Sequence, residues 1–141
     1  MRIKLIAPCG MNCGLCMAYL RDKKNCPGCR STEINPFKSC NNCTIKNCEH
    51  LEKKNLKYCS SECEKYPCPR LKNLDKRYRA KYSMSMIDNL DTIVNTGIFN
   101  FIALEKQRWI RENMVYCVHN KQYYDSKKIE DILKKIISLS L

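Results

Sequence analysis

Hydrophobic and polar residues follow a helical period in the second half of the chain. From residue 69 onward, apolar side chains recur every three or four positions, the spacing that places them on one face of a helix. The pattern predicts helices over residues 69–82, 85–95 and 98–112. The first is basic and begins with a proline, the second begins with a capping serine, and a glycine follows the second.

The pattern changes beyond the third predicted helix. Residues 114–124 alternate around an Asn120-Lys121 turn, which predicts a small β-hairpin. Residues 126–141 carry an apolar stripe, which predicts an amphipathic helix that docks onto the other helices.

The first half is organised differently, because cysteine, proline, glycine or asparagine interrupts it every few residues. Short helices are expected over residues 14–23 and 49–57, with a loop over residues 30–39 between them. Twelve residues of the chain are cysteines, and the first half has few aliphatic residues for a core. A segment of this kind usually needs a covalent or metal staple to fold.

These patterns predict a small α-rich, metal-stapled protein. An irregular N-terminal lobe of zinc knuckles and short helices would pack on a C-terminal helical lobe with a small β-hairpin. The change in architecture divides the chain into a cysteine-rich metal-binding region over residues 1–70 and a helical region over residues 71–141. The helical region includes the hairpin at 114–124.

The redox compartment decides whether the thiols form disulfides or bind metal. The N-terminus offers Leu5, Ile6 and Ala7 as an apolar run, well below the roughly 7 to 15 residues of a signal peptide. No later segment approaches the roughly 18 apolar residues that span a bilayer. The sequence therefore predicts a cytoplasmic protein with no membrane contact and with reduced thiols available to metal.

The cysteines of the first half form closely spaced groups that resemble metal-binding knuckles. The expected ligands are Cys9, Cys13, Cys16, Cys26, Cys29, Cys40, Cys43, Cys48, Cys59, Cys63 and Cys68. Two thiolates separated by two residues can hold one side of a tetrahedral zinc ion, so two knuckles must converge on each ion. These ligands predict roughly two to three zinc ions per chain, and the spacing leaves their pairing open.

One partition of the ligands follows the order of the chain. It places Cys13, Cys16, Cys26 and Cys29 on a first ion. A second ion would take Cys43, Cys48, Cys59 and Cys63. Cys9, Cys40 and Cys68 would remain for a third, with His50, His119 or Cys117 as the candidates for its fourth ligand.

An iron–sulfur cluster is the alternative cofactor. The spacing Cys9-x3-Cys13-x2-Cys16 is the one by which radical S-adenosylmethionine enzymes hold a four-iron cluster. Those enzymes build a large barrel around the cofactor, and a complete barrel takes roughly 200 residues or more. A chain of 141 residues cannot form one, so zinc is the preferred interpretation.

The formal charge of +12 indicates anionic partners. Eight metal-bound thiolates and two zinc ions would reduce it to roughly +8. The run Arg77-Tyr78-Arg79-Ala80-Lys81-Tyr82 alternates cations with aromatic rings, as some nucleic-acid-binding segments do.

The cysteine motifs resemble the "domain of unknown function 3795" family of prokaryotic proteins. They are Ala7-Pro8-Cys9-Gly10, Cys13-Gly14-x-Cys16 followed by Tyr19, Cys26-Pro27-Gly28-Cys29-Arg30, Cys43-x-Ile45-x-x-Cys48 and Cys59-x3-Cys63-x-x-Tyr66-Pro67-Cys68. A later stretch with Trp109 is similar to longer members, which extends the resemblance to about residue 120. The resemblance implies zinc binding, a degenerate zinc ribbon at the hairpin over residues 114–124, and no established activity.

Three functions follow from these observations. The first is an interaction module whose zinc ions are structural and whose basic surface recognises a protein or a nucleic acid. The second is an RNA- or DNA-binding zinc protein, and the third is an iron–sulfur redox protein or metalloenzyme. The sequence shows no catalytic triad, phosphate-binding glycine loop or recognisable carboxylate pair, which favours a role other than catalysis.

Overall fold

The structure is a computed structural model that describes residues 1–21, 24–31, 35 and 38–125. The predicted helix over residues 126–141 lies outside these residues. Short elements make up the cysteine-rich half, namely the 3-10 helices η1 (Ile3–Leu5) and η2 (Cys13–Leu15) and the α-helices α1 (Met17–Leu20), α2 (Lys38–Asn41) and α3 (Glu49–Lys53). The second half contains α4 (Pro69–Tyr82), α5 (Met86–Thr96), α6 (Ile98–Trp109), β1 (Ile110–Arg111), β2 (Met114–Cys117) and β3 (Gln122–Asp125).

The long helices confirm the periodicity of the sequence. The bounds of α4 are those predicted, with proline in its first turn. Helix α5 is capped as expected, because the Ser85 hydroxyl accepts a hydrogen bond from the Asp88 amide at 3.0 Å. Gly97 ends α5 with a positive φ of 88° and begins α6.

The short elements depart from the prediction. Residues 14–23 were expected to be one helix, but η2 and the four-residue α1 share this segment. Helix α3 ends at Lys53 instead of continuing to residue 57. The expected loop over residues 30–39 also ends early, since α2 begins at Lys38. Helices this short have little cooperativity of their own, so local turns and tertiary contacts set their ends.

The predicted hairpin is part of a three-stranded antiparallel sheet in the order β1-β2-β3. The third long helix was expected to reach residue 112, but Ile110 and Arg111 leave it and pair with Val115 and Met114 of β2. Strand pairing here overrides the local helical period, because in the sheet the two residues pair with residues of β2 instead of continuing the helix.

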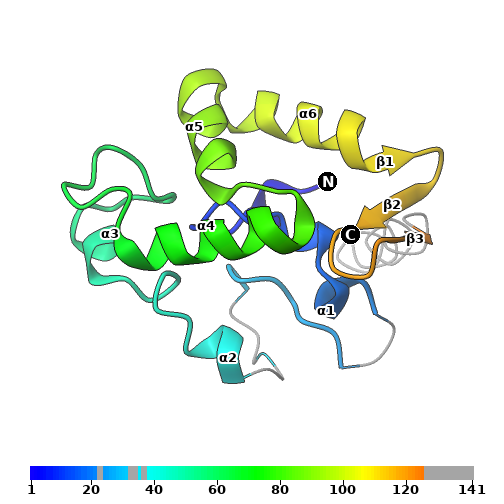
Figure 1. The fold of residues 1–141 in the computed structure, drawn as a ribbon, viewed down its shortest axis with the longest axis horizontal. Coiled ribbons are helices and arrows are strands. Elements are labelled where there is room, and N and C mark those ends of the chain that lie inside the picture. Colours follow the sequence, from blue (N-terminus) through cyan, green and yellow to red (C-terminus); the bar gives the residue numbers. More distant parts are fainter. Residues whose placement is uncertain (22–23, 32–34, 36–37, 126–141) are drawn as a thin grey trace, which may run out of the picture.

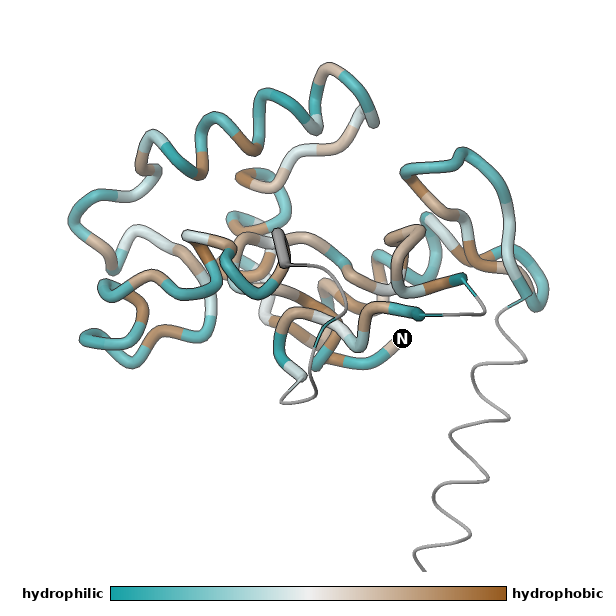
Figure 2. Tube along the Cα trace, turned by 90° about the horizontal axis from the view of Figure 1, so that it is seen from below, coloured by the Kyte–Doolittle hydropathy of each residue, from teal (hydrophilic) through white to brown (hydrophobic). Residues whose placement is uncertain are grey.

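The long helices and the short elements lie on different sides of the molecule (Figure 1). Helices α5 and α6 lie on one side of α4, and α1 and α2 lie on the other. The sheet continues from α6 at one end, and α3 lies at the opposite end. Hydrophilic and hydrophobic residues alternate along the helical parts of the chain (Figure 2), as expected for helices with one face on a core.

Both halves of the chain contribute to the main hydrophobic core. Leu5 and Leu15 from the cysteine-rich half pack in one cluster with Leu71, Leu90 and Val118 from the second half. The first half therefore buries its few aliphatic residues against the helices and the sheet.

Residues 6–12 form a tight turn at the centre of the molecule, which we call the central turn. Ile6 and Asn12 pair across it as an antiparallel bridge. The Ala7 amide donates to the Met11 carbonyl at 2.8 Å, and the Gly10 amide donates to the Ala7 carbonyl at 2.9 Å. The turn is therefore closed by its own backbone.

Distant segments of the chain bind the central turn. The Asn89 side chain on α5 donates to the Gly10 carbonyl at 3.0 Å, and the Asn12 side chain donates to Glu105 of α6 at 3.2 Å. On the cysteine-rich side, the Cys59 amide donates to the Pro8 carbonyl at 2.9 Å. The turn thus links both long helices to the cysteine-rich loops.

None of the helices among residues 1–21, 24–31, 35 and 38–125 has the length and apolar character needed to cross a membrane.

Gly10 occupies a position where the fold has no room for a side chain. Its φ is +91°, and a Cβ there would lie 2.8 Å from the Met86 carbonyl oxygen and 2.9 Å from Leu90 Cγ. Gly97 also has a positive φ, of +88°, but a Cβ there meets nothing within 4 Å. Alanine substitutions at these two glycines therefore distinguish the free-energy cost of the backbone conformation from that of a steric clash.

We expect Gly97→Ala to cost about 1–3 kcal/mol of unfolding free energy, from its backbone conformation alone. Gly10→Ala should cost about 1–3 kcal/mol more, because α5 must move away from the central turn. Urea unfolding of both variants at one fixed metal concentration measures the difference. An equal loss of unfolding free energy in the two variants would show that α5 does not pack closely against the central turn.

Asp75 links α4 to the start of α5. Its carboxylate, which is buried, accepts hydrogen bonds from the Ser85 hydroxyl at 2.7 Å and the Ile87 amide at 3.0 Å. The Arg79 guanidinium donates to the other oxygen at 2.6 Å. Burial acts to raise the pKa of Asp75, but these donors outweigh it and hold the pKa below its ordinary value of 3.8.

Asp75→Asn should reduce the unfolding free energy by about 1–3 kcal/mol at pH 7, because buried donors lose a charged acceptor. The folded-state pKa lies below the ordinary value, so this stabilisation is present above pH 3.8 and is lost as the pH falls through the lower folded-state pKa. The difference between wild type and variant should therefore be the same at about pH 5 and pH 7. Urea unfolding at both pH values tests this, with the exposed Glu112→Gln as control.

Candidate metal centre

All twelve cysteines lie in the described part of the chain, and all are free thiols. Cys9, Cys13, Cys26 and Cys117 are buried, and the others are half-buried. Their shared pocket and their strongest electrostatic contacts sort the thiols into three groups of four, with further interactions between groups from Cys9 to Cys59 and from Cys40 to Cys29.

The first group, the α4 thiol group, consists of Cys48, Cys59, Cys63 and Cys68. Burial, followed by the proximity of Cys68, Cys48 and Cys63, raises the pKa of Cys59 to about 12. Cys68 is the N-cap residue of α4. The Arg70 guanidinium contacts the Cys48 sulfur at 3.6 Å.

The four cysteines of the α4 thiol group line one small pocket. Leu51 and Leu71 form apolar parts of its wall, and its volume is about 30 Å³. A space of this size holds one water molecule or one ion, and it is far too small for an organic substrate.

The second group, the central thiol group, consists of Cys9, Cys13, Cys29 and Cys43. Burial raises the pKa of Cys9 to about 12, and Cys29 and Cys43 add to the shift. A hydrogen bond between Cys13 and Cys29 raises the pKa of Cys13, which burial raises further, and lowers the pKa of Cys29. The two thiols therefore titrate as a pair.

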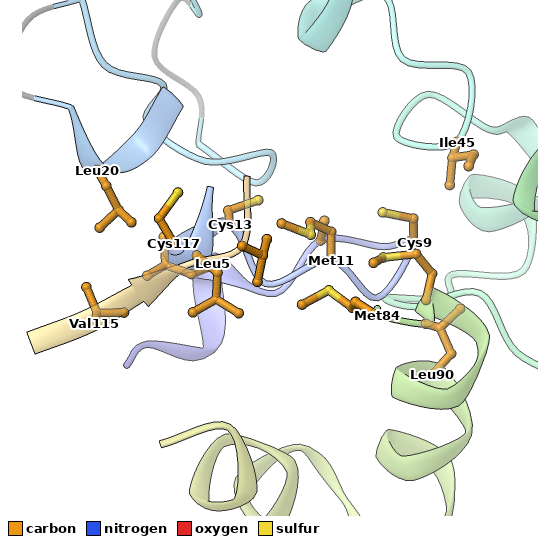
Figure 3. Close-up of a cluster of buried hydrophobic side chains, with 14 of the residues drawn as sticks. Leu5, Cys9, Met11, Cys13, Leu20, Ile45, Met84, Leu90, Val115 and Cys117 are labelled. Atoms are coloured by element: carbon orange, nitrogen blue, oxygen red, sulfur yellow. The ribbon is translucent and has the colours of Figure 1, made fainter. Parts of the chain in front are cut away.

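The third group, the hairpin thiol group, consists of Cys16, Cys26, Cys40 and Cys117. Burial raises the pKa of Cys16, and Cys26 and Cys117 contribute. Burial also raises the pKa of Cys40 to about 11, with Cys26, Cys29 and Cys16 as its charged neighbours. Figure 3 shows Cys117, Cys13 and Cys9 in one band of buried side chains that runs from Val115 to Leu90.

The chemistry of these groups fits a soft cation. Within the described residues, however, no three His, Cys, Asp or Glu side chains converge closely enough to hold a metal ion as they stand. The groups are defined by proximity rather than by ligand geometry. Crowded, buried thiols disfavour one another's ionisation, whereas a bound divalent cation reverses this effect and takes thiolates as its ligands.

The three groups differ from the partition predicted by chain order. Cys48, Cys59 and Cys63 were expected together and lie together, but Cys68 accompanies them in place of Cys43. Three close pairs are split between two groups, because the two cysteines of each pair have different thiol neighbours. They are Cys13/Cys16, Cys26/Cys29 and Cys40/Cys43. Spacing identified the candidate ligands but did not indicate which ones meet.

The two histidines occupy different environments. His50 lies in α3 and lines the pocket of the α4 thiol group, which already has four thiols. His119 has a partner at each ring nitrogen: the Met17 amide donates to Nδ1 at 3.3 Å, and Nε2 lies 3.0 Å from the Tyr78 hydroxyl. Burial lowers the pKa of His119, so the ring is neutral at pH 7. Both ring nitrogens of His119 thus have partners within the fold.

The tyrosines of the basic run on α4 face the protein. Tyr78 and Tyr82 are half-buried, and their ring centroids lie 5.8 Å and 4.9 Å from that of His119. Because both rings pack on His119, they are not exposed for stacking on bases. Of the predicted nucleic-acid-binding pattern, the structure leaves the cations exposed but not the aromatic rings.

Tyr78→Phe should reduce the unfolding free energy by about 0.5–1.5 kcal/mol, because His119 loses a hydrogen-bond partner in a half-buried site. Tyr82→Phe is the control, since the Tyr82 hydroxyl makes no hydrogen bond within the described residues and the ring contact is kept. Thermal unfolding of both variants measures the effect. An equal effect of the two changes would contradict the structural role of His119.

Residues 5–73 match the family described as "Protein of unknown function (DUF3795)". The matched segment includes the cysteine motifs of the first half, so residues 5–73 belong to this family. A search of the curated proteins and a search of the solved structures gave no match. Cys117 lies outside the matched segment.

Proposed function

We propose that this is a zinc-binding protein in which thiolate sites hold the cysteine-rich half in shape, and that the resulting rigid molecule acts as an interaction module. The observation that carries the proposal is the α4 thiol group, in which four cysteines from three segments surround one pocket the size of an ion. Zinc is preferred because it takes four thiolates in a tetrahedral site without redox chemistry.

The same group supports a structural role for the metal over a catalytic one. Four thiolates fill the coordination sphere of zinc, so neither water nor substrate has an open position on the ion. The pocket of about 30 Å³ gives no room for a substrate beside it. Cysteine-rich folds of this kind gain folding energy from the ion itself.

The interaction part of the proposal is supported by the exposed face of α4. The cations on this face are Arg70, Lys72, Lys76, Arg77 and Lys81. They would favour an anionic macromolecule. A protein partner is preferred over a nucleic acid, because Tyr78 and Tyr82 are packed on His119 and are not offered to bases.

Metal analysis of protein purified anaerobically without added metal tests the function. We expect about two to three zinc ions per chain and a colourless protein, and removal of zinc by a strong chelator should unfold the cysteine-rich half. Cys63→Ala should bind about one zinc ion fewer, because it opens the α4 thiol group. Ser61→Ala, an exposed position in the same loop, should keep the full complement.

Two outcomes would contradict the proposal. Bound iron with labile sulfide and a brown colour would assign the thiols to an iron–sulfur cluster. A wild-type protein that folds with no bound metal would show that the cysteines serve as small buried hydrophobic residues.

A further inference from the structure

Cys117 comes from the sheet, yet it lies against the start of the chain. The residue is fully buried at the end of β2. The amide of the next residue, Val118, donates to the Leu15 carbonyl at 3.1 Å. The Met17 amide in turn donates to His119 Nδ1 at 3.3 Å. These two contacts lie on either side of Cys16 and directly after Cys117, so they hold the two segments close together.

Cys26 reaches the same place from another segment. Its amide donates to the Ala18 carbonyl at 2.7 Å, which fixes the Cys26 backbone beside α1. Its sulfur accepts hydrogen bonds from the Asn35 side chain at 2.9 Å and from the Gly28 amide at 3.4 Å. Two N–H donors directed at one buried sulfur are the surroundings that stabilise a thiolate ligand.

Cys40 completes the set from α2. It interacts with Cys16 and makes a side-chain hydrogen bond with Cys26. Cys16 interacts in turn with Cys26 and Cys117. Each of the four thiols is thus near another member of the group.

Counting ligands supports the same grouping. The α4 thiol group and the central thiol group take four cysteines each, which leaves Cys16, Cys26 and Cys40 from the family segment. The fourth thiol near them is Cys117. His119, the other candidate on this strand end, has both ring nitrogens engaged.

We propose that Cys117 completes a four-thiolate zinc site with Cys16, Cys26 and Cys40, and that this ion fastens the sheet to the family segment. The inference rests on the proposed function, since it takes zinc as the ligand, and it adds a ligand from outside the matched residues 5–73. The site closes the hairpin onto α1 and α2 through one metal ion.

The shared site is tested by zinc stoichiometry in native mass spectrometry. Cys117→Ala and Cys40→Ala should each lose about one ion, and the double variant should lose no more than either single one. Cys63→Ala combined with Cys117→Ala should lose about two ions, because those residues serve different sites. Val118→Ala, which trims a buried neighbour of Cys117, should keep the wild-type metal content.

The outcomes separate this inference from the proposed function. If wild type binds zinc and Cys117→Ala retains all of it, or if the Cys40/Cys117 double variant loses two ions, the site is wrong while the zinc function stands. If wild type binds no zinc, the proposed function itself fails.

A second measurement covers the case in which Cys117→Ala does not fold. Hydrogen exchange of the β2 and β3 amides is compared in Cys40→Ala and Cys63→Ala, neither of which alters the sheet. Loss of the shared ion should speed exchange in the sheet in Cys40→Ala more than in Cys63→Ala. Equal exchange in the two variants would overturn the inference.

Discussion

The central turn is the constraint on which the other elements depend. It is seven residues long, yet three distant segments form hydrogen bonds with it. These segments are α5 through Asn89, α6 through Glu105, and the cysteine-rich loop through the Cys59 amide. Buried amides and carbonyls must find partners, so these bonds fix where both long helices and the cysteine loops can lie. The absence of a side chain at Gly10 lets α5 approach closely enough to make its contact. Two halves of unlike composition become one folded unit at this turn.

The second constraint is chemical, because sulfur replaces hydrocarbon in much of the cysteine-rich half. Cys9, Cys13 and Cys117 lie in the main core beside leucine and methionine side chains. Neutral thiols are weakly apolar and fill such positions. Burial, and after it the proximity of other thiols, raises the pKa of Cys9 and Cys59, and a soft cation would convert such clusters of thiols to ligands. The same residues therefore serve as core and as candidate metal centre, which explains how so few aliphatic residues organise the segment.

The sequence predicts best where one local pattern determines the structure. The bounds of α4 and the Ser85 cap of α5 follow from periodicity and capping, and the cysteine motifs identify the family. Tertiary contacts decide the rest. Ile110 joins β1 because Val115 lies opposite it. Each pair of cysteines separated by two residues is divided between groups, because the neighbours of its members come from distant loops. The packing of His119 against Tyr78 could not be foreseen, since 41 residues separate them and no spacing rule relates them.

The bond between Asn12 and Glu105 has a consequence for how the chain is made. Its two ends are 93 residues apart, and a ribosome adding about 5–20 residues per second takes roughly 5–20 s to produce the second end after the first. Throughout that interval the central turn has left the ribosome without the helix that holds it. Its one thiol, that of Cys9, is then accessible to oxidants and to stray metals until α6 emerges.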